Sequence, residues 1–177
     1  MASKRLQYGA TAKVFHWAVV LLIAIQLPLG WLMPDIGRGR APGSAMSLHI
    51  SIGITILVLI VLRFFWRLTH PVAPESHLPD WQRLSSELVH WLLYLAVLAT
   101  TISGWFFESA RGWSIKVYGL LPLPRLVESG SSLGHAVGQL HSTMVWILVA
   151  LLSVHILAAF VHLLIYRDRV MQRMLPG

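Results

Sequence analysis

The sequence contains no cysteine, and only 12% of its 177 residues are charged. Without cysteine the chain cannot form disulfides, thiolate metal sites or iron–sulfur clusters, and it cannot attach a c-type haem covalently. Any metal or haem must therefore be bound through histidine, of which there are nine. Because 56% of the residues are hydrophobic, the composition is not that of a water-soluble domain.

Acidic residues are also scarce, seven against fourteen basic ones, which gives a formal net charge of +7. A strongly basic chain can indicate nucleic-acid binding, but the apolar content argues against that partner. The basic residues are better explained as signals of membrane topology.

Four long apolar runs are separated by shorter polar segments, and each is long enough to cross a hydrocarbon layer about 30 Å thick. The first run follows a basic start, as in a signal peptide. It is longer than a signal core of about 7–15 residues and no clear A-x-A site follows, so we interpret it as a retained span. With no internal repeat, residues 1–177 are expected to form a single transmembrane domain. The predicted spans cover residues 14–33, 46–68, 84–107 and 137–166.

Four spans place both termini on the same side of the membrane. Nine basic residues fall on that side and five on the other. A cationic bias marks the cytoplasmic face, so both termini are predicted to be cytoplasmic and the long connection at residues 108–132 to face outward. The predicted fold class is an all-α membrane protein, a four-helix bundle.

The last span contains histidines at two well-separated positions. Residues 139–166 include His141, His155 and His162 but no Asp, Glu, Lys or Arg. Ionisable side chains in membrane helices are costly and usually face the bundle interior, where they have a function. His141 and His155 are fourteen residues apart, which is nearly four helical turns and a rise of roughly 21 Å. One helix face therefore presents imidazoles at two depths, which suggests two metal centres that each need a second ligand.

The second ligands follow from the depth of the other histidines. His49 lies a few residues into the second span and so is level with His141 near the outer surface. Arg63 follows His49 by fourteen residues, which places His155 level with Arg63 near the inner surface. His16 begins the outward-running first span and is also near the inner surface. The predicted pairs are His49 with His141 and His16 with His155, and each could hold one haem iron axially.

Each of these features also has a simpler interpretation. A membrane histidine can hydrogen-bond a neighbouring helix without binding a metal, although two depth-matched pairs favour ligands. Zinc needs about four ligands in one place, whereas a haem needs only two from the protein. Gly53, one turn after His49, could admit a flat macrocycle, but small-residue packing explains it equally well. His90 and His162 are assigned a polar role at a substrate site or beside haem propionates, with interfacial placement as the alternative.

Taken together, these residues resemble the bacterial cytochrome b561 family, which is related to the cytochrome b subunits of hydrogenases and formate dehydrogenases. The resemblance extends over essentially the whole chain. Beyond the histidine positions, the similar elements are F-H-W at 15–17, L-H-x-S-I-G from Leu48, L-R-x-x-W-R from Leu62 and D-R-x-x-x-R-M from Asp168.

The resemblance implies a cytochrome with two bis-histidine b haems in the bacterial inner membrane and a ubiquinone or ubiquinol partner. In one branch of the family the protein is a superoxide oxidase, in which periplasmic superoxide gives up an electron that reduces ubiquinone near the cytoplasmic side. His162 matches a histidine in that branch's quinone region. His90, Arg63 and Arg67 are candidate neighbours.

The outer connections carry five basic residues, among them Arg111, Lys116 and Arg125, against three acidic ones. A positive outer surface would attract a small anion such as superoxide, although these could also be ordinary loop charges or propionate partners. No catalytic residue is identified. Two alternatives remain: an electron-transfer subunit or shuttle between quinol and a periplasmic redox protein, and a structural or sensor membrane protein without haem.

Overall fold

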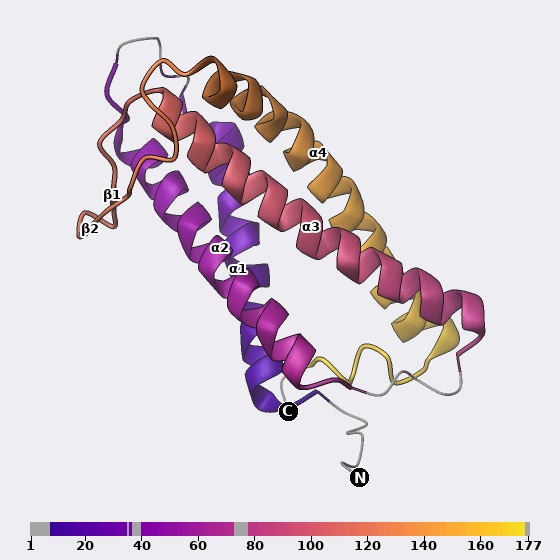
Figure 1. Ribbon diagram of the computed structural model, residues 1–177. Helices are drawn as coiled ribbons and strands as arrows, with labels where there is room; N and C mark the ends of the chain where they lie inside the picture. Colours follow the sequence, from indigo (N-terminus) through magenta and orange to yellow (C-terminus); the bar gives the residue numbers. More distant parts are fainter. Residues whose placement is uncertain (1–7, 35, 37–39, 73–77, 176–177) are drawn as a thin grey trace.

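Four long helices form the bundle in the computed structural model, which describes residues 8–34, 36, 40–72 and 78–175 (Figure 1). Each helix is long and apolar enough to cross a membrane, and this confirms the predicted four-helix membrane fold. The last helix continues directly into a short π-helix. The elements are α1 (Ala10–Leu32), α2 (Ser44–Thr69), α3 (Asp80–Ala110), α4 (Ser132–Val161) and η1 (His162–Tyr166).

Each helix starts before the apolar run that predicted it. Hydropathy detects only the apolar part of a helix, whereas the hydrogen-bonded backbone continues into polar residues near the membrane surface. The fourth helix shows the cause most clearly, because it begins at Ser132 rather than at residue 137. The side chain of Ser131 accepts a hydrogen bond from the backbone N–H of Gly134 at 3.3 Å, and this cap fixes the earlier start.

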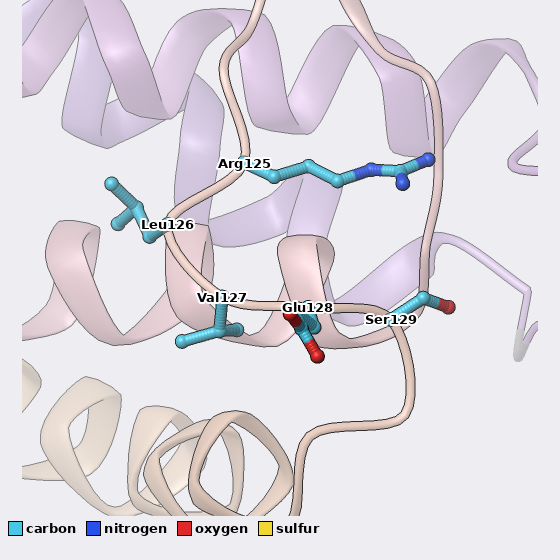
Figure 2. Close-up of a pocket in the computed structure, with 5 residues that line it drawn as sticks. All are labelled: Arg125, Leu126, Val127, Glu128 and Ser129. Carbon is cyan, nitrogen blue, oxygen red and sulfur yellow. The ribbon is translucent and has the colours of Figure 1, made fainter.

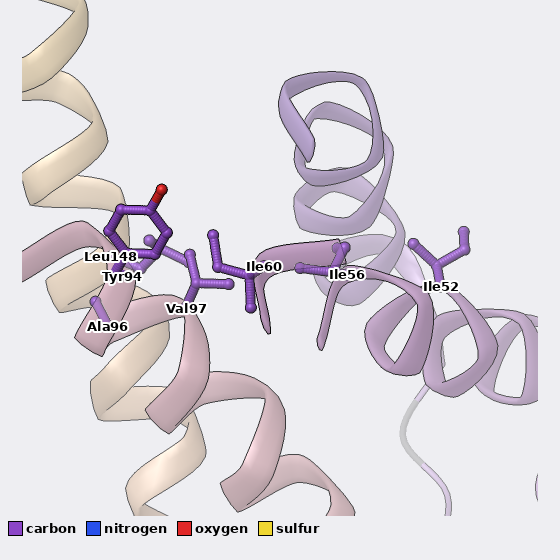
Figure 3. Packing of buried hydrophobic residues seen from close by; sticks show 7 residues of the cluster. All are labelled: Ile52, Ile56, Ile60, Tyr94, Ala96, Val97 and Leu148. Atoms are coloured by element: carbon purple, nitrogen blue, oxygen red, sulfur yellow. The ribbon is translucent and has the colours of Figure 1, made fainter. Parts of the chain in front are cut away.

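The apolar core lies between the two histidine levels. Ile52, Ile56 and Ile60 recur every four residues, so they share one face of α2, and they pack towards α3 (Figure 3). Leu148 adds to this cluster from α4, seven residues from both His141 and His155. The helices therefore bury a dry layer at mid-height. The remaining members of the cluster are Tyr94, Ala96 and Val97 of α3.

Both ends of the described chain lie at the same end of the bundle. The segment after η1 runs back beneath the helices towards the start of α1 (Figure 1). There the indole N–H of Trp17 donates a hydrogen bond to the carbonyl of Met174 at 2.8 Å. The assignment of this end to the cytoplasm rests on the charge bias. Three of the residues that contribute to that bias, Lys4, Arg5 and Arg38, fall outside the described residues.

At the other end, the long connection forms a small hairpin beside α2. Its strands are β1 (Lys116–Val117) and β2 (Leu121–Pro122), which pair antiparallel. Nearby, the indole of Trp113 is buried and donates to the carbonyl of Arg40 at 3.0 Å. The connection is thus folded onto the bundle.

Close packing of α3 on α4 depends on small residues, and this gives a stability prediction. A Cβ added at Gly138 would lie 2.7 Å from the Cβ of Phe107 and would overlap its ring. Gly138→Ala is therefore expected to lower the free energy of unfolding by about 1–3 kcal/mol, as overpacked sites do. Thermal unfolding in one fixed detergent measures the change. Gly43→Ala is the matched control because a Cβ there would meet nothing within 4 Å; equal loss of stability in both variants would contradict the argument.

Candidate functional site

His49 of α2 and His141 of α4 face each other near the hairpin end of the bundle. Their ring centroids are 6.4 Å apart and the ring planes are nearly perpendicular, at 83°. The Nδ1–H of His141 donates to the backbone carbonyl of Thr100 at 2.8 Å. This bond fixes the tautomer and leaves Nε2 of His141 as a free electron-pair donor. His49 presents a buried Nδ1 with no hydrogen-bond partner among the described residues.

The second pair lies at the opposite end. His16 of α1 and His155 of α4 have ring centroids 6.3 Å apart at an interplanar angle of 76°. His90 of α3 joins them, because its ring centroid lies 5.2 Å from that of His155. The Nδ1–H of His90 donates to the carbonyl of Ser86 at 2.6 Å. Among the described residues, the inner site therefore contains three imidazoles, whereas the outer site contains two.

Two arginines of α2 border the inner histidines. The guanidinium of Arg63 donates to the carbonyl of Ala12 at 3.1 Å and lies within electrostatic range of all three rings. Arg67 packs over the ring of Trp91, with its Cζ 5.1 Å from the ring centroid, which is a cation–π geometry. Arg63, Arg67 and His90 thus belong to one neighbourhood.

His162 does not belong to that neighbourhood. Its Nδ1 pairs with a carboxylate oxygen of Asp168 at 2.5 Å, and its ring lies against Tyr166. The described contacts of His162 are with its own chain terminus rather than with His90, Arg63 or Arg67. The four residues predicted for the quinone region are therefore divided between two places.

The spacing of each histidine pair fits a metal atom between the rings. Two imidazoles on opposite sides of one metal, each bonded at about 2 Å, have centroids about 6 Å apart. Over the described residues, no Cα atom of α1 or α2 lies within 8 Å of one in α4. The paired histidines therefore come from helices whose backbones are not in contact. Within the same residues, no group of three or more His, Cys, Asp or Glu could hold a metal ion. Each pair would supply the two side-chain nitrogens that a haem needs from the protein, because a haem brings four nitrogens of its own.

Glycines lie directly against both rings of the outer pair. A Cβ added at Gly30 of α1 would lie 3.0 Å from Cε1 of His49. A Cβ at Gly104 of α3 would lie 3.0 Å from Cε1 of His141. Gly53, which the sequence suggested as a place where a flat macrocycle could approach the backbone, does not lie against either ring; the side-chain amide of Gln26 is 3.4 Å from the position of its Cβ. Depth matching could have found Gly30 and Gly104, since both lie near the outer ends of their spans.

Gln26 is a second residue that sequence reasoning missed. Its amide N–H donates to the backbone carbonyl of His49 at 2.9 Å, and its own carbonyl oxygen is buried without a hydrogen-bond partner among the described residues. This contact joins α1 to α2 at the outer pair. Apart from His16, Gln26 is the one strongly polar side chain in the predicted span at residues 14–33, and that was the available signal.

The outer basic residues are less free than the steering hypothesis assumed. Arg111 donates to the carbonyl of Ile36 at 2.7 Å and packs over the ring of Trp113, so it braces the outer connections. Arg125 donates to the carbonyl of Gly112 at 3.0 Å. Lys116 is exposed on β1.

A shallow pocket in the outer connection includes Arg125. It is lined by five consecutive residues, 125–129, whose side chains spread in different directions from one loop (Figure 2). It contains none of the histidines, so we regard it as a feature of the loop surface rather than the functional site.

Glu108 was counted among the outer loop charges, but the structure places it inside the outer end of α3. Its side chain is only 2% exposed. The hydroxyl of Ser109 donates to one carboxylate oxygen at 3.4 Å, and the other oxygen has no hydrogen-bond partner among the described residues. Helix α3 continues beyond the predicted span, and this extension carries Glu108 under the outer connection.

Comparison with known proteins agrees with this arrangement. The family model described as prokaryotic cytochrome b561 matches residues 7–177. "Cytochrome b561 homolog 2" of Escherichia coli K12 is 31% identical over 173 residues, which cover 96% of this chain and 91% of the relative. "Probable superoxide oxidase CybB" of Yersinia pestis is 30% identical over 175 residues, or 96% of each chain. "Cytochrome b561 homolog 1" of E. coli K12 is 26% identical, covering 96% of this chain and 97% of the relative.

The match over nearly the whole chain, together with four membrane-spanning helices and histidines paired across the bundle, leads to one conclusion. The chain belongs to the prokaryotic cytochrome b561 family, whose members are multi-pass bacterial membrane proteins that bind b-type haem and transfer electrons.

Proposed function

We propose that this protein is a di-haem superoxide:ubiquinone oxidoreductase of the inner membrane. The observation that carries the proposal is the presence of two histidine pairs at opposite ends of one bundle, with ring separations of 6.4 and 6.3 Å. The relative named as a probable superoxide oxidase supports the substrate class. In the overall reaction two superoxide anions each lose one electron to become dioxygen, and ubiquinone takes up both electrons and two protons.

The chain would hold one haem between His49 and His141 and the other between His16 and His155. Bound haem iron supplies reversible one-electron chemistry. The Thr100 carbonyl keeps the imidazole of His141 in the tautomer that a metal ligand needs. The isoleucine layer of α2 between the two levels excludes water from the middle of the bundle.

For the quinone, the inner neighbourhood offers the necessary donors. His90 commits Nδ1 to Ser86, which leaves its other ring nitrogen for a quinone oxygen. Arg63 brings positive charge to the same place, which stabilises a reduced quinone oxygen before it is protonated. The His162–Asp168 pair lies nearer the end of the chain and could relay protons from the aqueous side.

Purified protein in lipid nanodiscs gives the direct test. We expect a b-type absorption spectrum on reduction, two haems per chain, and ubiquinone reduction that follows a superoxide source at well above the uncatalysed rate. A haem-free protein would contradict both the family assignment and the proposal. Two haems without superoxide-dependent quinone reduction would contradict the substrate alone.

An electron shuttle between quinol and a periplasmic redox protein is the second candidate. It is favoured by the engagement of Arg111 and Arg125 with backbone carbonyls, which uses N–H groups of both arginines that a bound small anion would otherwise accept from. The superoxide assay separates the two candidates, since the shuttle transfers electrons only when its protein partner is present.

Anion steering predicts a salt-dependent effect of the exposed outer cations. The double variant Lys116→Glu, Arg125→Glu is expected to slow superoxide use roughly two- to tenfold at low ionic strength. The difference should shrink above about 0.1 M salt, where the Debye length falls to about 10 Å. Arg169→Glu, an exposed cation at the opposite end, is the control and should have no effect. Equal rates for all forms at low salt would argue against steering.

A further inference from the structure

The β1–β2 hairpin lies beside α2 rather than above the bundle (Figure 1). The backbone N–H of Tyr118 donates to the hydroxyl of Ser51 at 3.0 Å, and the Tyr118 hydroxyl bonds that of Thr55 at 2.9 Å. These partners lie five and nine residues after the start of the apolar run at residue 46, which corresponds to depths of about 7 and 14 Å. Because the hydrocarbon layer is about 30 Å thick, the hairpin contacts α2 within one half of it.

The hairpin tip exposes large apolar surfaces, although the Tyr118 hydroxyl turns back to Thr55. Leu120 is 80% exposed, Leu121 69% and Tyr118 51%. Just before the hairpin, Trp113 and Ile115 are buried, so the connection is anchored on its inner side. Such a firmly held apolar tip indicates a contact with apolar surroundings.

Several backbone N–H donors of the hairpin are satisfied internally, as a lipid environment requires. Non-helical backbone is tolerated at membrane depth only where its polar groups are satisfied. Positive φ angles at Tyr118 and Gly119 reverse the chain tightly, and Pro122 has no N–H to satisfy. Besides the Tyr118–Ser51 bond, three backbone N–H groups donate to nearby backbone carbonyls. The N–H of Gly119 donates to Lys116 and that of Leu120 to Val117, both at 3.0 Å, and the N–H of Leu123 donates to Ile115 at 2.9 Å.

We propose that the β1–β2 hairpin is immersed in the membrane leaflet at its end of the bundle, where Leu120, Leu121 and the ring of Tyr118 contact lipid acyl chains. Lys116 is exposed at the base of the hairpin, and a lysine side chain there is long enough to reach the lipid phosphates. The partner of this surface is the bilayer itself. The hairpin therefore adds a fifth membrane-embedded element to the four spans, whichever electron donor the protein uses.

The absence of cysteine makes a clean accessibility experiment possible. Three full-length, haem-loaded single-cysteine variants are compared in lipid nanodiscs: Leu120→Cys, Ser129→Cys as the aqueous reference and Leu95→Cys as the lipid reference. Ser129 is exposed on the outer connection, and Leu95 is 63% exposed in the middle of α3. The probe is a large, water-soluble maleimide, and labelling in denaturant gives the total thiol.

We expect Leu120→Cys to react at least tenfold more slowly than Ser129→Cys and similarly to Leu95→Cys. A rate equal to that of Ser129→Cys would overturn the proposal.

Slow labelling could also arise if another protein chain covered the tip. Benzophenone maleimide is therefore attached to Leu120→Cys in detergent, and the labelled protein is reconstituted and irradiated. Mass spectrometry should find a lipid adduct. A cross-link to a second copy of the chain, without a lipid adduct, would overturn immersion and identify the tip as an interface between copies.

Discussion

Replacing His141 with alanine is expected to leave about one haem per chain instead of two, because His141 would be one of the two side chains that hold the outer haem. The ring of His141 meets His49 at 6.4 Å, and the described structure shows no third histidine at that level. The reduced spectrum should lose about half of its b-type absorbance, and haem extraction should give the same ratio. Superoxide-driven quinone reduction should fall to background.

The complementary variant His155→Ala should remove the inner centre instead. The two haems should have different reduction potentials, because the described inner site has a third imidazole and Arg63 beside it and the outer site does not. A redox titration should therefore lose one potential in His141→Ala and the other in His155→Ala. His135→Ala is the matched control on α4, because that ring packs on Phe107 and belongs to neither pair. Full retention of both haems in His141→Ala and His155→Ala would contradict the ligand assignment.

Gly104→Val is expected to damage the outer centre almost as severely while leaving every histidine in place. A Cβ at this position would lie 3.0 Å from Cε1 and 3.1 Å from Nδ1 of His141, and the branched side chain must displace the ring. Metal-binding geometry tolerates shifts of only about 0.5 Å, so the outer haem should be lost or bound with an altered ligand field. Haem stoichiometry and the low-temperature electron paramagnetic resonance spectrum measure the two outcomes.

Two further substitutions make this prediction specific. Gly30→Val should act in the same way through His49, because a Cβ there approaches that ring equally closely. Gly53→Ala should be tolerated, since its nearest neighbour is the amide nitrogen of Gln26 at 3.4 Å, which is an ordinary van der Waals distance. An unchanged outer haem signal in both valine variants would show that the glycines serve helix packing alone.

At the inner site, the depth of a histidine in its span does not predict which side chains it contacts. A polar role at a substrate site or beside haem propionates was predicted for His90, but no local pattern could tell that its ring would meet that of His155, with the ring centroids 5.2 Å apart. His162 lies only seven residues beyond His155, but the helix changes to a π-helix at His162, and the ring pairs with Asp168 instead. A local change of helical pitch of this kind has no signature in hydropathy.

The outer connection shows a different limit. Arg111, Lys116 and Arg125 were equivalent charges in the sequence, but the fold gives them different environments. Arg111 is held by a carbonyl and two aromatic rings, Arg125 by a carbonyl, and Lys116 is exposed on a hairpin beside α2. Loop conformation depends on long-range contacts, such as that of Tyr118 with Ser51, which no local pattern reveals.

The sequence by itself determined the four membrane helices and predicted which histidines share a level, His49 with His141 and His16 with His155, because hydropathy and the rise of about 1.5 Å per residue are local properties. Only the tertiary structure decided which glycine lies against which ring, and that His90 joins the inner histidines while His162 does not. It also decided that Glu108 is buried and that the hairpin of the outer connection lies along α2. These depend on the rotation of each helix about its axis and on its neighbours. Side-chain packing sets both, and it acts between residues far apart in the chain.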